Sequence, residues 1–308
     1  MSAILLAGSD TSESLRGFAR SIGQIVLQRH AATGALLVAA VCSFSPRLAC
    51  ALLIGALTGN VIAYIVEDAG SPAMREDLYG FNGALAALAA FGFIRDDSQA
   101  GAVAIVSAML ATGLSFRLGR ALEHWPLPAY SSPAVLVTWC WLPLFADAPS
   151  GAAAAATVST AAPASWASAI VAGFSPIVFT TGFVAGALIL VGLVAAQPAR
   201  PVSAAWALTG STLGVALHAL AGTPAAVVLS GGCGFNATLT ALATSKFGVK
   251  GVLGGGVVCV LVERVAAALG IPALTAPFVL ASWAVQAFVQ RLETPANNGD
   301  SHVVHPPA

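Results

Sequence analysis

A short motif, G-F-N-x-x-L, occurs twice in the chain, and this duplication constrains the fold more than any other feature. The copies are Gly80–Leu85 and Gly234–Leu239, roughly half a chain apart, and each lies in an apolar segment. Phe and Leu four residues apart share one helical face, glycine lets another backbone approach, and an Asn near a helix start can cap free N–H groups. One copy means little, but two indicate a duplicated architecture.

Other landmarks recur in the same order on either side of the motif. Gln24–Leu27 matches Pro176–Phe179, Gly34–Leu37 matches Gly186–Ile189, Leu127–Pro133 matches Ile271–Pro277, and Val137–Trp139 matches Ala281–Trp283. Coincidence explains four ordered landmarks poorly. We therefore interpret the chain as two homologous halves.

The charge content restricts the class of protein. Only 8% of the residues are charged and 57% are hydrophobic, whereas a soluble domain carries about 25% charged residues. With a mean hydropathy of +0.86, the chain is expected to be a polytopic membrane protein rather than a soluble one. The net charge of +0 gives no basic surface for nucleic acid.

Apolar segments predict about ten transmembrane helices, five in each half. In the first half they lie at about 32–45, 48–66, 80–94, 99–118 and 133–146; in the second, at 183–196, 204–221, 225–243, 248–269 and 276–290. An amphipathic segment at 12–29 and a short apolar piece at 165–179 precede the two sets. We read these two as half-membrane helices.

Five spans per half, an odd number, put tandem halves in opposite membrane orientations. The expected fold is an all-α integral membrane protein with two inverted five-span repeats at 1–148 and 165–292, a connector at 149–164 and a polar, disordered tail at 293–308. With a cytoplasmic N-terminus, the outer loops hold three of the thirteen lysines and arginines and the inner segments hold the other ten. The positive-inside rule then places both termini in the cytoplasm.

The repeated residues are the candidates to line a path between the halves, since inverted repeats usually hold substrate near the midplane. Phe81 and Phe235 offer apolar faces, and Ser131 and Thr275 offer hydroxyls. Prolines beside the hydroxyls leave carbonyls without N–H partners, which membranes tolerate only where buried or lining a cavity. Intramembrane carboxylates are scarce, with Glu263 expected at the interface. This favours passive passage of a small neutral polar solute.

At these motifs the chain resembles the urea transporters of bacterial type. The resemblance is carried by G-F-N-x-x-L in both halves and by Ile271–Phe278, which is similar to the family's L-P-x-x-T-x-P-F signature. It extends from about Leu15 to Arg291. It implies a channel for urea in the bacterial inner (plasma) membrane, a homotrimer, and one pore between the halves of each protomer. No cofactor is expected.

The resemblance also implies two urea sites on either side of a narrow centre. One site matches Gln24, Leu27 and Phe81, the other matches Pro176, Phe179 and Phe235, and the centre matches Ile25, Leu85, Ser131, Ile177, Leu239 and Thr275. The chemistry suits urea, because burying an unpaired amide-like group costs roughly 2–7 kcal/mol and a row of oxygens offsets this cost stepwise. Apolar walls exclude hydrated ions.

The sequence departs from the family pattern at four positions. Leu27 stands where a Phe is usual, and Pro176 stands where the side-chain oxygen of a Gln or Glu is expected. Ser131 and Ala134 replace the Thr and the Phe of the signature in the first half. Because Pro176 lacks this oxygen, the sequence indicates another small amide as an alternative solute.

Three other function classes stay open. A channel for a short-chain amide, ammonia or water shares the fold logic. A membrane enzyme needs clustered acid–base or metal groups, and the scattered His30, His124 and His218 predict neither catalysis nor metal binding. A scaffold would carry no flux. The five cysteines, none in a C-x-x-C pair, are interpreted as buried small hydrophobes.

Overall fold

A computed structural model describes residues 2–66, 80–125, 127–145 and 165–293, with the side chains of 2–11 excepted. All regular structure in these residues is helical, which confirms the all-α prediction. The connector at 149–164, and the tail from residue 294 on, lie outside the described residues.

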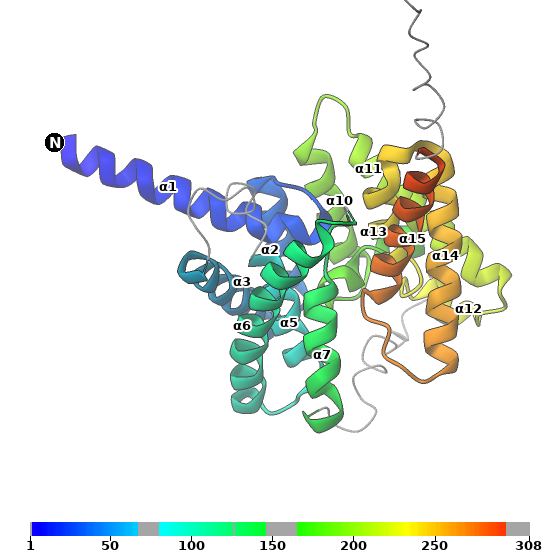
Figure 1. Cartoon of the computed structure of the whole chain (residues 1–308), viewed down its shortest axis with the longest axis horizontal. Coiled ribbons are helices and arrows are strands. Elements are labelled where there is room, and N and C mark those ends of the chain that lie inside the picture. Colours follow the sequence, from blue (N-terminus) through cyan, green and yellow to red (C-terminus); the bar gives the residue numbers. More distant parts are fainter. Residues whose placement is uncertain (1, 67–79, 126, 146–164, 294–308) are drawn as a thin grey trace, which may run out of the picture.

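The helices of the first half follow the apolar segments of the sequence closely. They are α1 (Ser2–Gly23), η1 (Gln24–Val26), α2 (Ala31–Phe44), α3 (Pro46–Val66), α5 (Gly80–Phe93), α6 (Asp97–Leu122) and α7 (Ser132–Phe145). In Figure 1 they lie on one side of the molecule, with α1 projecting away from the rest.

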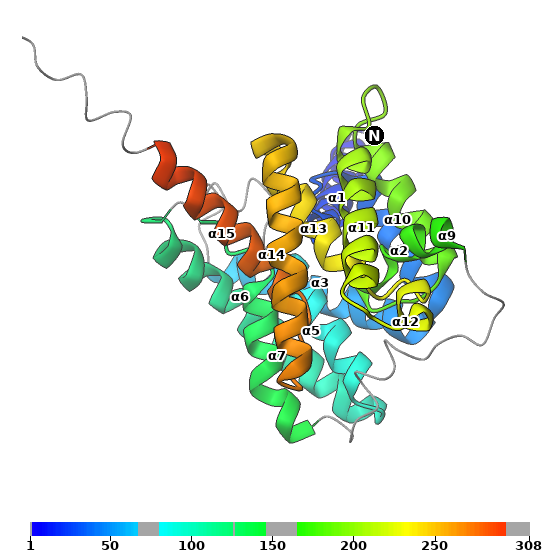
Figure 2. The ribbon, with the colours of Figure 1, turned by 90° about the vertical axis from the view of Figure 1, so that its right-hand side faces the viewer.

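The second half repeats this order, with one break that the sequence analysis missed. Its helices are α9 (Trp166–Ala172), η2 (Ser175–Val178), α10 (Phe183–Ala196), α11 (Val202–Leu220), α12 (Ala225–Leu229), α13 (Phe235–Thr244), η3 (Ser245–Phe247), α14 (Gly248–Ala268) and α15 (Ala276–Glu293). The span expected at 225–243 is interrupted between α12 and α13, where Gly231 adopts φ 86°. Figure 2 shows α14 beside α13 and α15.

Only part of the helix set is long and apolar enough to cross a bilayer unaided. By length and composition, three of the described helices qualify, or up to five if each of two bent pairs forms one span: Pro46–Val66, Asp97–Leu122, Phe235–Ala268, and the pairs Ser12–Val26 with Ala31–Phe44 and Trp166–Val178 with Phe183–Ala196. The apolar helices α5 and α7 have 14 residues each. The membrane class is supported, while the count of ten spans stays a prediction.

The two bent pairs have the same local design. Each bends sharply, by 71° in the first half and 81° in the second, and each bend contains a non-glycine residue in the left-handed region, Leu27 (φ 58°) or Phe179 (φ 60°). Such a residue costs roughly 1–2 kcal/mol, which the surrounding packing must offset. The duplication seen in the sequence therefore extends to backbone conformation.

A glycine lets each bent pair close on itself. A Cβ atom at Gly34 would lie 1.8 Å from Ala19 O, and a Cβ atom at Gly186 would lie 2.0 Å from Val171 O. Only glycine allows the second helix of each pair to approach the first this closely. These glycines are the second landmark that the two halves share.

Helix α5 forms the centre of the first half. Its residues 80–90 are all buried, as expected for a helix that is apolar on every side. At its contact with α3, a Cβ atom on Gly55 would lie 2.4 Å from Gly83 O. In the second half, a Cβ atom on Gly210 would lie 2.5 Å from Ala237 O, which is the corresponding approach.

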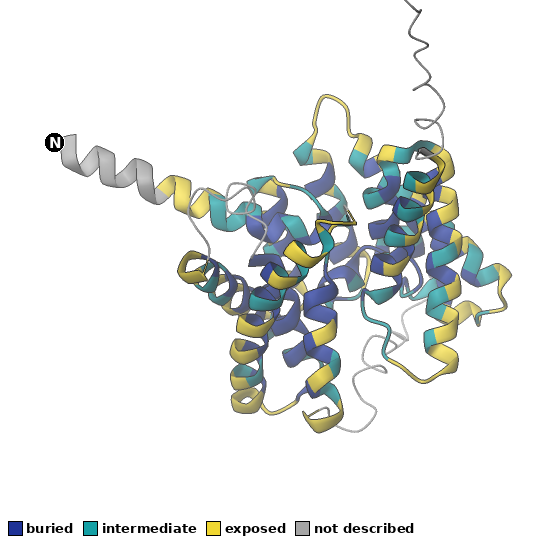
Figure 3. Cartoon of the chain, in the orientation of Figure 1, coloured by how far each residue is buried: buried dark blue, intermediate teal, exposed yellow. Residues whose placement is uncertain are grey.

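The outward faces of the outer helices in both halves are exposed and apolar, as on Leu57, Leu110 and Leu261 (Figure 3). This pattern is typical of a protein surrounded by lipid.

The cysteine interpretation holds for two of the five residues. Cys233 and Cys259 are buried, but Cys42, Cys50 and Cys140 are exposed, and all five are free thiols. An apolar helix surface in a bilayer does not need to bury its small hydrophobes in protein, so exposure follows from the membrane setting.

Candidate functional site

Two hydroxyls from opposite halves meet inside the protein. Ser131 Oγ lies 2.7 Å from Thr275 Oγ1, within hydrogen-bond distance, and both residues are buried. Either atom can be the donor. One hydroxyl hydrogen and several lone pairs remain for a third partner. The sequence assigned these two residues to the centre of the path, and the structure brings them together.

Each hydroxyl residue lies within a tight turn. We call Leu127–Pro133 and Ile271–Pro277 the signature turns. Tyr130 and Leu274, directly before the hydroxyl residues, both have φ 48°. The helix after each turn begins at once, at Ser132 or Ala276. This left-handed step reverses the chain so that a hydroxyl and a helix start lie side by side in each half.

The Asn of each G-F-N motif holds the carbonyl at this step. Asn82 Nδ2 donates to Tyr130 O and Asn236 Nδ2 donates to Leu274 O, each at 3.0 Å. Asn82 Oδ1 also accepts from Ala134 N at 3.3 Å. The expected capping role is thus found, but Asn82 caps α7 rather than its own helix.

Two tryptophans bond across the halves to the signature turns. Trp139 Nε1 donates to Pro272 O at 2.8 Å, and Trp283 Nε1 donates to Pro128 O at 2.7 Å. The carbonyls beside the prolines, expected to lack N–H partners, receive these indole bonds instead.

The apolar candidates gather in one cluster. Eight predicted site residues belong to the main hydrophobic core or pack against it: Ile25, Phe81, Leu85, Ile177 and Leu239 are buried members, and Leu27, Phe179 and Phe235 pack against them. Phe179 makes an edge-to-face contact with Phe93, with ring centroids 6.4 Å apart. The short helices η1 and η2, which carry residues of the two expected urea sites, contact each other.

The remaining candidates are Gln24 and Pro176. Both are half-buried in the short helices η1 and η2. The carbonyl of Pro176 accepts a hydrogen bond from Phe179 N at 3.1 Å, and this bond stabilises the bend between η2 and α10. Proline has no side-chain acceptor, and the difference between the halves seen in the sequence persists here.

The sequence analysis missed an ionisable pair that is largely shielded by the protein. Glu263, expected at the membrane interface, has a side chain only 11% exposed, and its Oε2 lies 2.9 Å from His218 Nε2. Its other oxygen accepts from Asn236 Nδ2 at 2.7 Å. The acidic residue in an apolar run was the available signal, since such residues in membranes usually have a partner.

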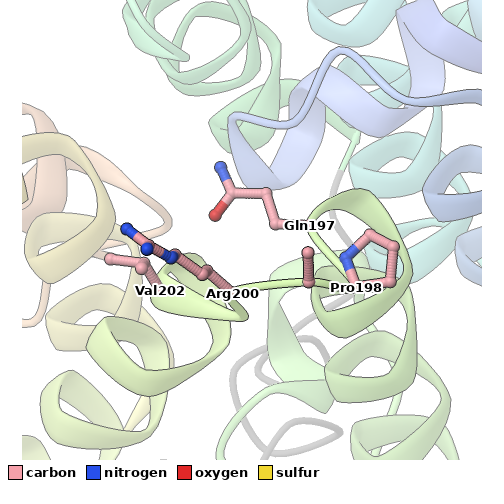
Figure 4. A pocket seen from close by; sticks show the side chains of 5 residues that line it. Gln197, Pro198, Arg200 and Val202 are labelled. Carbon is pink, nitrogen blue, oxygen red and sulfur yellow. The ribbon is translucent and has the colours of Figure 1, made fainter.

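In the described part of the chain, neither a metal cluster nor the surface hollow at the α10–α11 loop competes with this centre. No group of three or more His, Cys, Asp or Glu side chains there could hold a metal ion. A surface hollow of about 380 Å³ lies at the loop between α10 and α11, lined by Gln197, Pro198, Ala199, Arg200 and Val202 (Figure 4). None of these is a candidate residue, and a loop hollow provides no path between the halves.

Comparison with known proteins supports one family. The family model described as "Urea transporter" matches residues 15–290, which is most of the chain and includes both copies of every motif above. No curated protein matches the chain.

Proposed function

The chain belongs to the urea transporter family, a family of membrane transporters rather than enzymes, and we propose that it conducts urea passively through a path between its two halves. Urea transport across a membrane follows from the family. The channel mechanism and the course of the path are our proposal. The observation that carries it is the contact of the Ser131 and Thr275 hydroxyls, one from each half, at 2.7 Å inside an apolar core.

The hydroxyl pair suits a planar amide. Urea has four N–H hydrogens and one carbonyl oxygen, and it loses its water partners on entering an apolar path. Lone pairs on the two hydroxyls accept N–H bonds, and the spare hydroxyl hydrogen is free to donate to a carbonyl oxygen. These bonds offset the desolvation cost of roughly 2–7 kcal/mol at the narrowest point.

The apolar residues form the walls on either side. Leu85 and Leu239 lie one helical turn after Phe81 and Phe235 and are buried in the same cluster. Uncharged apolar walls cannot replace the hydration shell of an ion, so ions are excluded while a neutral solute passes. The aromatic rings hold a flat solute edge-on before it reaches the hydroxyls.

Passive passage fits the buried ionisable groups that the structure describes. Glu263 faces His218 and Asn236, so its oxygens are already engaged. A proton-coupled transporter requires a relay of titratable groups along the path. The described hydroxyl centre has two neutral groups as its polar components.

The arrangement around this path follows from the same proposal. The halves, 1–148 and 165–292, form inverted five-span repeats, and both termini lie in the cytoplasm. The protein is a homotrimer in the bacterial inner membrane, with one path in each protomer. These features rest on the family resemblance, the odd span count and the distribution of positive charge.

One observation favours a second candidate solute. Pro176 supplies no side-chain oxygen at the second site, and its carbonyl bonds to Phe179 N. A solute with fewer N–H groups than urea loses less at such a site. A short-chain amide such as acetamide is therefore the alternative substrate.

The deciding experiment is urea uptake by proteoliposomes, followed by light scattering. Thr275→Val and Ser131→Ala remove the two central hydroxyls, and Thr112→Val is the matched control, because the buried Thr112 Oγ1 has no hydrogen-bond partner. We expect fast, non-saturating uptake by the wild type, severalfold slower uptake by the first two variants, and no change in the control. Wild-type uptake equal to that of empty vesicles would rule out a urea channel, and acetamide uptake would then test the alternative.

A further inference from the structure

Two crossed hydrogen bonds join the signature turns that carry the hydroxyl pair. Trp139 lies on α7, which follows the first signature turn, but its indole bonds to Pro272 in the second turn. Trp283 lies on α15, which follows the second turn, and its indole bonds to Pro128 in the first. Each half therefore donates one indole to the other half's turn.

The geometry is the same in both directions. Each acceptor proline lies three residues before its hydroxyl residue, and each tryptophan lies eight residues after the hydroxyl of its own half. The backbone N–H groups within the turns donate to other carbonyls and not to those of the prolines: Ser132 N donates to Ala129 O, and Ala276 N donates to Ala273 O. The indoles are thus the described donors for Pro128 and Pro272.

Two opposed bonds fix a separation better than one. Moving the two turns apart lengthens both indole bonds and the bond between Ser131 and Thr275 at the same time. The Trp139 bond is half-buried, whereas the Trp283 bond is exposed in the single chain, so we expect the Trp139 bond to resist stretching more, because a shielded carbonyl that loses its donor is costly. An indole is also rigid, since only two side-chain torsions place it.

We propose that Trp139 and Trp283 set the width of the path at its centre and so determine which small amides pass. They are positioning residues, acting through the signature turns on the hydroxyls of Ser131 and Thr275. This inference rests on the proposed function, because the position of the turns has a measurable consequence only if solute passes along the hydroxyl pair that joins them.

The test compares urea with N-methylurea, which adds one methyl group to the same planar amide. Trp139→Phe, Trp283→Phe and the double variant keep an aromatic ring and lose the N–H donor. The matched control is Trp141→Phe on the same helix, because Trp141 Nε1 is buried without a hydrogen-bond partner. Permeability to both solutes is measured in proteoliposomes with equal amounts of protein.

We expect the ratio of N-methylurea to urea permeability to rise about fivefold or more in the double variant. A fitted pocket discriminates roughly 10- to 200-fold between solutes that differ by one methylene, and a loosened path should lose part of that discrimination. Each single variant should give a smaller rise, and Trp141→Phe none. If the double variant does not assemble, the single variants carry the test, since each removes one of the two bonds.

The contrary outcomes are distinct. Suppose that the wild type conducts urea and that the flux of both solutes falls equally in the tryptophan variants. The tryptophans then only hold the fold together, so this result overturns the inference and leaves the proposed function intact. A ratio that rises as much in Trp141→Phe also overturns it. A wild type that conducts neither solute overturns the proposed function and the inference together.

Discussion

Asn236 Nδ2 donates to Glu263 Oε1 at 2.7 Å, and this bond couples a G-F-N motif to a half-buried carboxylate. The same nitrogen donates to Leu274 O, the carbonyl next to Thr275. Asn82 in the other half instead caps α7 through its Oδ1, whereas Asn236 Oδ1 is buried without a partner. The two copies of the motif therefore hold their signature turns by the same Nδ2 bond and differ in the second contact that each Asn makes.

We predict that Glu263→Ala destabilises the protein by about 1–3 kcal/mol, because Asn236 loses an acceptor and His218 keeps only its bond to Thr223. Glu263→Gln keeps an acceptor for Asn236 and should recover most of the loss. Thermal unfolding of the purified protein in detergent measures both. Glu123→Ala, at an exposed position after α6, is the control and should leave the transition unchanged. Equal unfolding temperatures for the wild type and Glu263→Ala would show that this carboxylate contributes nothing to stability.

The sequence predicted the helices well because their signal is local. Apolar runs bounded by polar or glycine-rich segments define α2, α3, α10 and α14 to within a few residues. The pairing of Ser131 with Thr275 was also within reach, since the duplicated motifs marked both residues. A repeat places equivalent residues at equivalent positions, and inverted repeats bring such positions together.

The missed features depend on partners far away in the chain. Trp139 finds its acceptor 133 residues later, and Glu263 finds His218 45 residues earlier. No local pattern specifies such a pair, so Glu263 looked like an interfacial residue at the end of an apolar run. The break between α12 and α13 was missed for another reason. A glycine-rich run, Ser230–Gly234, lies inside this segment and marks the break, but the apolar residues on either side of it favoured one continuous span.

The bent pairs should not tolerate a side chain at their contact glycines. Gly34→Val and Gly186→Val place atoms on the backbone of the preceding helix, where Cβ alone would come within 2.0 Å. Overpacking of this kind costs about 1–3 kcal/mol or more. We expect sharply lower yields of folded protein in size-exclusion chromatography. Gly113→Val is the control, because nothing lies within 4 Å of its Cβ position. Normal yields for Gly34→Val would show that the contact between α1 and α2 is looser than in the structure.

The aromatic wall in the second half is expected to be required for flux. Phe235→Ala removes a ring that packs against the main core, and we predict that urea flux falls severalfold while assembly is unchanged. Phe288→Ala on α15 is the matched control, since that ring is 63% exposed. Uptake by proteoliposomes and the elution volume of each variant measure flux and assembly separately. Unchanged flux in a correctly assembled Phe235→Ala would remove this residue from the site.

Replacing Pro176 with glutamine tests why the two halves differ. Gln24 occupies the matching position in the first half, so Pro176→Gln gives both halves a side-chain amide oxygen. Residue 176 lies in the first turn of η2, where the carbonyl and not the side chain serves the bend, so the backbone should accept the change. We expect the ratio of urea to acetamide permeability to rise severalfold, because urea has twice as many N–H hydrogens to bond. Pro201→Gln, at the exposed position before α11, controls for the general effect of losing a proline and should leave this ratio unchanged. An unchanged ratio in Pro176→Gln would mean that the solute does not contact residue 176, and the second site would then have to be built from Phe179 and Phe235 alone.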